Sequence, residues 1–288
     1  MLTHEDKLNK IISEIGATAE DSYNYFHTRN ALVPSRKEVI SILKSIQCLM
    51  FPDYFHLPEQ KEKSRMQILD DIFIKIKRQI TASYAFCSNC NTAPVVDTEG
   101  LAYEIISEIP RIKDALIKDV QAIYEGDPAA KAPEEIILSY PGFYAISIYR
   151  IAHEFYVRKI PFISRLMTEF AHEKTGIDIH AGATIGEYFF IDHGTGVVIG
   201  ETTTIGHHVR IYQGVTLGAK SFELDENGNP VKGTKRHPDI GNHCIIYANA
   251  TILGGKTRIG DGAVIGGNVW LTHSVGDGEK IYYAADRI

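Results

Sequence analysis

The sequence has no long apolar run, no excess of positive charge and few cysteines. A membrane-spanning helix needs about 20 consecutive apolar residues, and no segment of this chain approaches that length. The net charge is −6 and the pI is about 6.1, which argues against nucleic acid or anionic lipid as a main partner. The first residues, MLTHEDKLNK, lack the basic and apolar regions of a signal peptide. We therefore expect a cytoplasmic protein without a membrane span.

The four cysteines do not form a pattern that predicts a metal site. Cys87 and Cys90 form one CSNC pair, while Cys48 and Cys244 stand alone. A structural zinc site needs a second pair of ligands at suitable spacing, and none lies near this pair. We therefore expect four reduced thiols, as is usual in the cytoplasm.

The chain does contain two halves with different periodicities. In residues 1–175 apolar residues recur three and four positions apart, which is typical of amphipathic helices. The clearest such stretches are residues 7–16, 35–50, 67–80 and 100–124. This half predicts an all-helical domain.

From about residue 176, aliphatic residues recur every six positions. A helix would repeat near 3.6 residues and a strand near 2, whereas a period of six is the hexapeptide repeat of a parallel β-helix. Three hexapeptides make one triangular coil with aliphatic residues inside and small residues at the corners. The predicted fold is therefore α+β, with a helical domain at 1–175 followed by a left-handed parallel β-helix at 176–288. The repeat positions are Ile179, Ile185, Ile191, Ile199, Ile205, Ile211, Leu217, Ile240, Ile246, Ile252, Ile259, Ile265 and Leu271.

Two interruptions of this repeat coincide with histidines. The interval from Ile191 to Ile199 is two residues too long and contains His193. A second interruption, residues 218–239, is polar, contains ENGNP and ends beside His237, so we expect it to protrude as a loop. A residue needed only for the prism would require no break, so both histidines are candidates for function. After Leu271 the repeat fades into a tail at 272–288.

Several motifs, in order, resemble those of serine O-acetyltransferases. They are DIHAGATIG, DHGTGVVIGETTTIG, QGVTLGAK and KRHPDIG, preceded by GDPAA and PGFYAISIYRIAHEF. The resemblance covers about residues 115–275, and residues 1–95 are a weaker match assigned to oligomerisation. The long acidic loop segment SFELDENGNPVKG and Lys235 depart from the family pattern. The resemblance implies transfer of acetyl from acetyl-CoA to the hydroxyl of L-serine, which gives O-acetyl-L-serine in cysteine biosynthesis.

Such a transfer needs a base, because the serine hydroxyl is a weak nucleophile at neutral pH. Histidine suits this role since its ordinary pKa lies near 6.5, and we assign it to His193. By resemblance, Asp178 is the carboxylate partner that fixes the imidazole. The two are 15 residues apart, close to the 18 of one coil, so their side chains can meet on one face. One base and two bound substrates suffice for direct transfer in a ternary complex.

The amino acid and acetyl-CoA need separate binding groups. Arg236 suits the serine carboxylate because a guanidinium can bind it through two hydrogen bonds, and Asp127 and Asp192 suit the ammonium. His237 would orient serine beside them. By resemblance, small residues contact the pantetheine arm, and a backbone N–H near Gly218 would stabilise the thioester oxyanion. These small residues are Gly218, Ala219, Ala248 and Gly267.

The resemblance also implies partners. No cofactor is permanently bound, and acetyl-CoA is a co-substrate. L-Cysteine is expected to inhibit by occupying the serine site. The β-helices assemble as a homotrimer with active sites between chains, and helical halves pair trimers into a hexamer. The terminal carboxylate of Ile288 can enter the active site of O-acetylserine sulfhydrylase; alternatively, Ile288 caps the last coil.

Three other interpretations remain open from the residues alone. A hexapeptide acyltransferase acting on a sugar or antibiotic hydroxyl shares the prism and the histidine, but would not require Arg236 and His237 with Asp127. A β-helix carbonic anhydrase would bind a metal through three histidines, and the spacing of the available set does not fit cleanly. A non-catalytic trimeric scaffold is the third. The candidate metal ligands would be His193, His237 and His243, whereas His207, His208 and Glu201 are expected to be structural.

Overall fold

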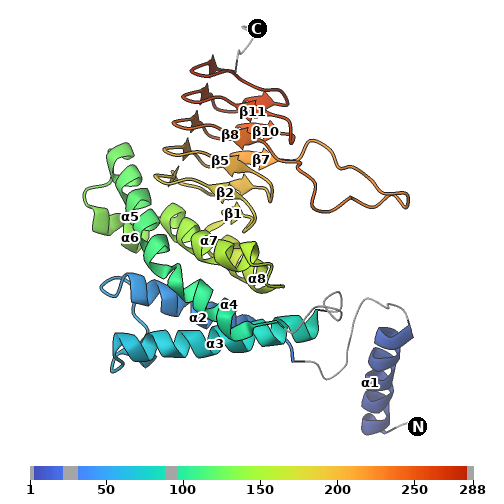
Figure 1. The fold of residues 1–288 in the computed structure, drawn as a ribbon. Coiled ribbons are helices and arrows are strands. Elements are labelled where there is room, and N and C mark those ends of the chain that lie inside the picture. Colours follow the sequence, from blue (N-terminus) through green and yellow to red (C-terminus); the bar gives the residue numbers. More distant parts are fainter. Residues whose placement is uncertain (1–2, 22–31, 88–95, 284–288) are drawn as a thin grey trace.

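The computed structural model describes residues 3–21, 32–87 and 96–283. Helices come first along the chain and the β-helix follows (Figure 1). The predicted α+β fold with a left-handed parallel β-helix is confirmed. The helices are α1 (His4–Asp21), α2 (Arg36–Met50), the 3-10 helix η1 (Pro58–Gln60), α3 (Arg65–Phe86), α4 (Thr98–Ser107), α5 (Ile109–Gly126), α6 (Pro133–Ser139), α7 (Pro141–Val157) and α8 (Ile163–Thr175).

Local sequence signals set the helix boundaries. Ser64 and Gln67 form a capping box that starts α3, and Ser35 caps α2. The helical stretch at 100–124 consists of two helices, α4 and α5, which meet at Glu108. Pro110 explains the break, since it has no N–H to continue a helix and fits only the first turn of the next one.

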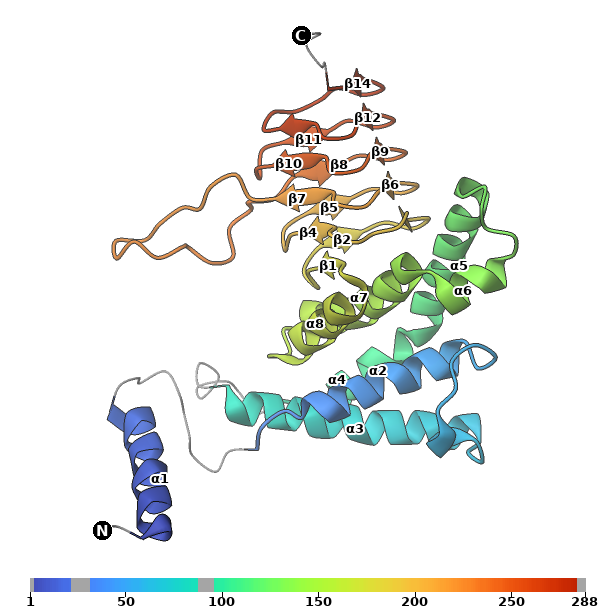
Figure 2. The ribbon, with the colours of Figure 1, turned by 180° about the vertical axis from the view of Figure 1, so that it is seen from behind.

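The β-helix consists of strands of two or three residues in three parallel sheets (Figure 2). All thirteen predicted repeat positions lie in these strands and are buried. Sheet A has the order β1-β4-β7-β10-β13, sheet B β11-β8-β5-β2 and sheet C β14-β12-β9-β6-β3. The strands are β1 (Asp178–Ile179), β2 (Thr184–Ile185), β3 (Phe190–Ile191), β4 (Val198–Ile199), β5 (Thr204–Ile205), β6 (Arg210–Ile211), β7 (Thr216–Gly218), β8 (Asp239–Ile240), β9 (Ile245–Ile246), β10 (Thr251–Leu253), β11 (Arg258–Ile259), β12 (Val264–Ile265), β13 (Trp270–Leu271) and β14 (Lys280–Ile281).

The coil continues further than the six-residue repeat indicates. Strand β14 pairs with β12, with Ile281 in register with Ile265. Part of the expected tail therefore belongs to the prism. Ile288 lies outside the described residues.

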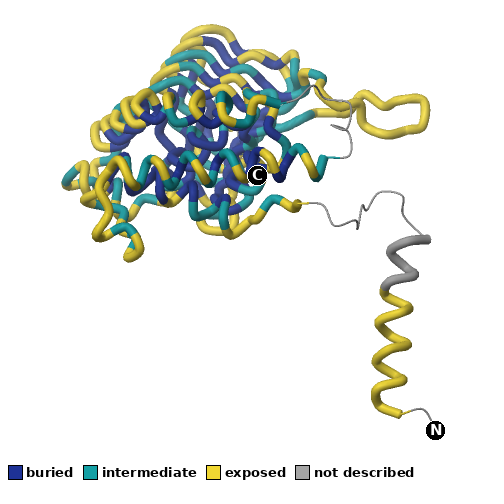
Figure 3. Tube along the Cα trace, turned by 60° about the horizontal axis from the view of Figure 1, so that its bottom comes forward, coloured by how far each residue is buried: buried dark blue, intermediate teal, exposed yellow. Residues whose placement is uncertain are grey.

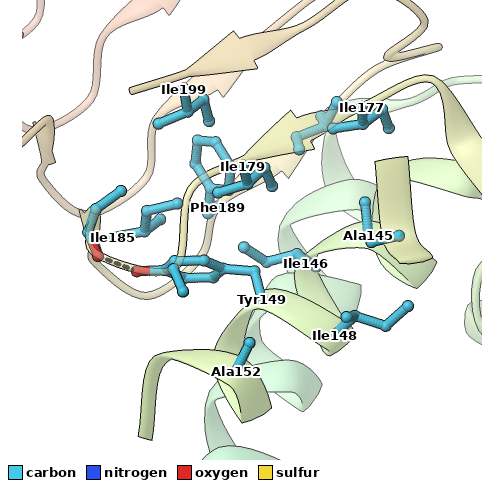
Figure 4. Packing of buried hydrophobic residues seen from close by; sticks show 14 of the residues in the cluster. Ala145, Ile146, Ile148, Tyr149, Ala152, Ile177, Ile179, Ile185, Phe189 and Ile199 are labelled. Atoms are coloured by element: carbon cyan, nitrogen blue, oxygen red, sulfur yellow. Dashed lines mark hydrogen bonds between the residues drawn. The ribbon is translucent and has the colours of Figure 1, made fainter. Parts of the chain in front are cut away.

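The helices pack against the first coils through a shared core. The Tyr149 hydroxyl on α7 donates a 2.6 Å hydrogen bond to the Ala183 carbonyl, beside a cluster of buried aliphatic side chains (Figure 4). Arg150 and Asp119 form a buried ion pair 2.7 Å apart. Asp119 also accepts the Phe189 N–H at 2.9 Å, and Arg150 donates to the Gly186 carbonyl at 2.8 Å. This pair ties α5 and α7 to the first coil.

Residues 219–238 leave the coil between β7 and β8 as a loop (Figure 1). Residues 220–233 are exposed, and Figure 3 shows this loop and the described part of α1 in the exposed colour. The loop ends at Pro238, whose carbonyl accepts the Thr204 N–H at 3.4 Å.

The cysteines differ from one another in state. Cys48 and Cys244 are buried free thiols, and burial raises the pKa of Cys244 to about 11. Cys87 is disulfide-bonded, so the prediction of four reduced thiols is wrong there; Cys90 lies outside the described residues. None of the helices in the described ranges is both long enough and apolar enough to cross a bilayer.

Candidate functional site

His193 lies at the corner between sheets C and A, in the turn that joins β3 to β4. We call this turn and the turns stacked on it the His193 corner (residues 192–197, 212–215, 247–250 and 266–269). The His193 side chain is 73% exposed, and its Nε2 is 3.8 Å from Asp192 Oδ1. The imidazole is thus accessible and has a carboxylate beside it.

The helical half brings a second carboxylate to this corner. Asp127 ends α5, and its Oδ2 accepts a 2.7 Å hydrogen bond from the Tyr140 hydroxyl. That hydrogen bond, together with burial and nearby charges that include Asp192, raises the pKa of Tyr140 to about 12. Asp127 and Asp192 therefore both act on Tyr140, and their role as an ammonium site stays a prediction.

A cavity of about 490 Å³ opens above His193 along the same corner. It includes Ala248 and Gly267, two of the four residues expected to contact the pantetheine arm. The other two, Gly218 and Ala219, lie at the end of β7 beside the loop, outside this cavity. The lining residues are His193, Tyr212, Gln213, Tyr247, Ala248, Asn249, Gly266, Gly267, Asn268 and Tyr282.

Asp178 lies in β1 of sheet A, partly buried. Among the residues that the structure describes, no hydrogen bond or ion pair joins Asp178 to His193, whose nearest carboxylate is Asp192. The expected meeting of Asp178 and His193 on one face is therefore not a contact in this structure.

His237 lies at a different corner, between sheets A and B. We call this the His237 corner (residues 200–203 and 235–238). The His237 ring is buried, and its Nδ1 accepts the Thr202 N–H at 3.1 Å. Burial and the adjacent Arg236 charge lower the pKa of His237 to about 4. The ring is therefore neutral at pH 7 with its proton on Nε2, which makes it a hydrogen-bond donor.

A network holds Arg236 next to His237. Arg236 forms an ion pair with Glu201, which also accepts a 2.7 Å hydrogen bond from the Tyr156 hydroxyl on α7. Although burial raises the pKa of Glu201, the hydrogen bonds from Tyr156 and Arg236 lower it below its usual value. Glu201, expected to be structural, thus positions the guanidinium.

The segment before His237 is anchored to the coil below it. The Thr202 hydroxyl accepts the Arg236 and His237 N–H groups at 3.0 and 3.1 Å. Lys235, a departure from the family pattern, donates to the Thr202 carbonyl at 2.5 Å and to Asp239 at 2.6 Å. These bonds fix the end of the loop on the turn between β4 and β5.

One chain does not bring the two halves of the site together. Strand β4 of sheet A separates the turn with Asp192 and His193 from the turn on which Arg236 and His237 lie. His243 lies at the third corner, between sheets B and C, stacked on His208 with ring centroids 4.7 Å apart. The three histidines of the metal alternative are thus at three corners, and no group of metal-ligating side chains occurs in the described ranges.

Sequence reasoning missed five residues near these corners. Tyr140 lies between α6 and α7 and Tyr156 lies on α7, so no β-helix periodicity points to them. The others are one or two positions after buried repeat residues, Ile211 and Ile246. Alignment of successive coils would have placed them above the turn that contains Asp192 and His193. These three are Tyr212, Gln213 and Tyr247.

The chain is similar to serine acetyltransferases along nearly its whole length. The profile described as "Serine acetyltransferase, N-terminal" matches residues 75–147. A plasmid serine acetyltransferase of Synechococcus elongatus is 41% identical over 293 residues, covering 97% of this chain and 92% of that protein. Serine acetyltransferase isoform 3 of Entamoeba histolytica, in complex with cysteine, has a TM-score of 0.72 at 34% identity, covering 98% of this chain and 94% of that one.

A second solved structure is that of the Neisseria gonorrhoeae serine acetyltransferase in complex with serine. Its TM-score is 0.55 at 25% identity, covering 88% of this chain and 97% of that one. Because the identity to the Synechococcus protein is 41% over almost the full length of both chains, this chain belongs to the serine acetyltransferase family of acyltransferases.

Proposed function

We propose that this chain transfers acetyl from acetyl-CoA to L-serine with His193 as the general base, in a site shared by two copies of the chain. The observation that carries the proposal is the accessible His193 imidazole, which lines a 490 Å³ cavity and has Asp192 Oδ1 at 3.8 Å from its Nε2. The proposed transfer requires such a base beside both a slot for the donor and a carboxylate for the ammonium of serine.

In the proposed reaction, His193 removes the hydroxyl proton as the serine oxygen attacks the thioester carbon. Collapse of the tetrahedral intermediate breaks the carbon–sulfur bond, and the CoA thiolate takes the proton back from the imidazolium. Asp192 is the carboxylate nearest to His193 and can stabilise that imidazolium. We keep Asp178 as the proposed carboxylate that orients the His193 imidazole. Because the transfer is direct, it requires no covalent enzyme intermediate.

We propose that the neighbouring copy supplies Arg236 and His237. Two observations support this. The two halves of the site lie at separate corners of one chain, and the outer face of sheet A between them carries exposed apolar side chains, Val198 at 37% and Trp270 at 68%. Such a face is suited to contact with another copy. The neutral His237 Nε2–H would donate to serine, and Arg236 would bind its carboxylate.

The same arrangement divides the acetyl-CoA site. Ala248 and Gly267 line the His193 cavity, while Gly218 and Ala219 lie at the end of β7 on the His237 side. We propose that the pantetheine arm runs between the two copies. A homotrimer, and its pairing into a hexamer through the helices, follow from the resemblance and would be measured by light scattering.

The test of the base is acetyl-CoA consumption with L-serine and a panel of other hydroxylated acceptors. His193→Ala should lower kcat by about 10²–10⁴-fold, the scale of losing a general base, while CoA still binds. The exposed His273 on the β-helix provides the control, and His273→Ala should keep full activity. Turnover at the wild-type rate by His193→Ala would show that His193 is not the general base. Preference for a sugar acceptor over L-serine would favour a sugar acyltransferase instead.

A mixing experiment tests the shared site. Co-assembled His193→Ala and His237→Ala chains should regain activity that neither variant has alone, because some interfaces then combine two intact halves. No gain on mixing, with mixed oligomers present, would place the whole site in one chain.

We further propose that L-cysteine competes with L-serine, as its sulfur replaces only the hydroxyl oxygen. The Entamoeba relative in complex with cysteine supports this. Arg236→Ala should weaken cysteine inhibition and serine binding together by about ten-fold or more, the usual effect of losing a charged hydrogen bond. Cysteine inhibition that is indifferent to Arg236 would exclude a common site. The contact of Ile288 with O-acetylserine sulfhydrylase stays a prediction.

A further inference from the structure

A column of stacked residues rises along the His193 corner. Ile191, Ile211, Ile246 and Ile265 are in register in sheet C, so the turns that follow them stack. The N–H groups of Gly214, Asn249 and Asn268 donate to the carbonyls of Thr195, Gln213 and Ala248. Successive coils are about 4.8 Å apart, the spacing of hydrogen-bonded strands. The stacked residues are Thr195, Gln213, Ala248 and Gly267, and His193 lies two residues before Thr195 in the same turn.

Gln213 is therefore one coil above the proposed base, in the same cavity. Its side-chain oxygen Oε1 is buried and has no hydrogen-bond partner within the described residues. Buried polar atoms in folded proteins almost always have a partner, since an unsatisfied one costs about 1–3 kcal/mol. An acceptor left unpaired beside a base indicates a ligand with a hydrogen-bond donor.

Two tyrosines form a wall next to this acceptor. Tyr212 and Tyr247, each one position before a member of the column, stack with ring centroids 5.1 Å apart and planes at 15°. Both rings line the cavity. On the two coils directly above Gln213 the column consists of Ala248 and Gly267, whose small size leaves space beside the two tyrosine rings.

We propose that Gln213 accepts a hydrogen bond from the amide of acyl-CoA nearest its sulfur, with Tyr212 and Tyr247 as the wall of the pantetheine arm. This rests on the proposed function. The thioester must lie within about 3–3.5 Å of the serine oxygen that His193 deprotonates. Two methylene groups separate the sulfur from the first amide nitrogen, a reach close to one coil spacing of about 4.8 Å.

The position of the carboxylates argues against the serine ammonium as the partner of Gln213. Asp192 is on the same coil as His193, and Asp127 comes from α5 at the helical end. Gln213 lies in the opposite direction, toward the far end of the prism. The ammonium and the donor amide are thus recognised on opposite sides of the base.

The test compares two small acetyl donors with L-serine as acceptor. S-acetyl-N-acetylcysteamine contains the amide, and S-butyl thioacetate lacks it. The wild type should favour the amide donor by about five-fold in kcat/KM, the effect of one neutral hydrogen bond. Gln213→Leu, of similar size, should lose this preference without raising the KM for serine, and Gln213→Glu, which keeps an acceptor, should retain it.

Further variants separate the wall from the acceptor. Tyr247→Ala should raise the KM of both donors alike, because it removes wall contact and leaves the acceptor. The control is Gln121→Leu, since Gln121 is exposed on α5 and bonds Glu125; it should change nothing. An undiminished amide preference in Gln213→Leu, or a rise in serine KM instead, would overturn the proposal.

Calorimetry with CoA alone keeps this inference separate from the proposed function. Gln213→Leu should weaken CoA binding by about five-fold relative to the wild type and Gln121→Leu. If the wild type acetylates no serine but binds CoA about five-fold more tightly than Gln213→Leu does, serine is not the acetyl acceptor and the role of Gln213 stands. Equal CoA affinity in all three proteins would overturn that role.

Discussion

Replacing Gly200 by alanine should disable His237 while the β-helix stays folded. Gly200 follows Ile199 at the turn over which the His237 ring lies. A Cβ added there would be 2.1 Å from Cδ2 and 2.3 Å from Nε2 of His237. The backbone of Gly200 is outside the left-handed region, so alanine itself is tolerated and the ring must move.

The size of the movement sets the expected loss. Ordinary contact begins at 3.4 Å, so the nearest ring atom must shift by about 1.3 Å. A misplacement of about 1 Å costs on the order of 10²-fold in rate, and we expect a loss of that order in kcat/KM for serine. The lost Thr202 hydrogen bond should cost about 1 kcal/mol of stability, or a few degrees in Tm.

The matched control is Gly241→Ala. Gly241 follows Ile240 at the equivalent position of another corner, and its added Cβ would be 2.3 Å from Asp261 Oδ1. Its Cβ would also lie 2.8 Å from the Asp261 backbone nitrogen, so Gly241→Ala should cost at least as much stability as Gly200→Ala. It should leave kcat/KM unchanged, as measured by CoA release and thermal unfolding. Full activity in Gly200→Ala, or an equal loss in Gly241→Ala, would refute the role given to the position of His237.

Two further predictions concern stability. Asp119→Asn should lower the free energy of unfolding by about 3–5 kcal/mol, because it leaves the buried Arg150 without its counter-charge; a urea midpoint close to wild type would show that the pair is not needed. Burial lowers the pKa of His237 to about 4 in the folded protein, against about 6.5 when unfolded, so its contribution to stability is full above pH 6.5 and falls as the pH drops toward 4. In urea unfolding, the free energy of unfolding should therefore fall less for His237→Gln than for the wild type between pH 7.5 and pH 5. An equal fall in both proteins would contradict this prediction.

The interior of the β-helix was predictable because its period follows from geometry. Each coil needs an inward aliphatic residue on each of three faces, so residues such as Ile211 and Ile252 mark strands regardless of their surroundings. The same regularity made the interruptions visible, and with them His193 and His237. The helical stretches were predictable for the same reason, and Pro110 accounts for the break between α4 and α5.

Contacts between distant segments were not predictable. Tyr156 reaches Glu201 only because α7 packs against the first coils, and no local pattern encodes that distance. The separation of His193 from Arg236 depends on which corner each turn occupies, which requires counting through a long interruption. The unpaired oxygen of Gln213 is a property of its surroundings and not of its residue type.

The long loop has a consequence for how this fold can vary. Paired positions in sheet A are 20, 18 and 19 residues apart for Ile179–Ile199, Ile199–Leu217 and Ile252–Leu271. The interval from Leu217 to Ile252 is 35 residues, yet these two residues pair directly. The additional residues therefore lie outside the prism and add no coil.

His237 keeps its place because Thr202 and Lys235 bind its segment to the coil below, whatever the number of residues that precede it in the loop. The loop can lengthen, shorten or change its charge without moving the histidine or the axial spacing between Gln213 and Ala248. Access to the site and the geometry within it are thus free to diverge independently in related sequences.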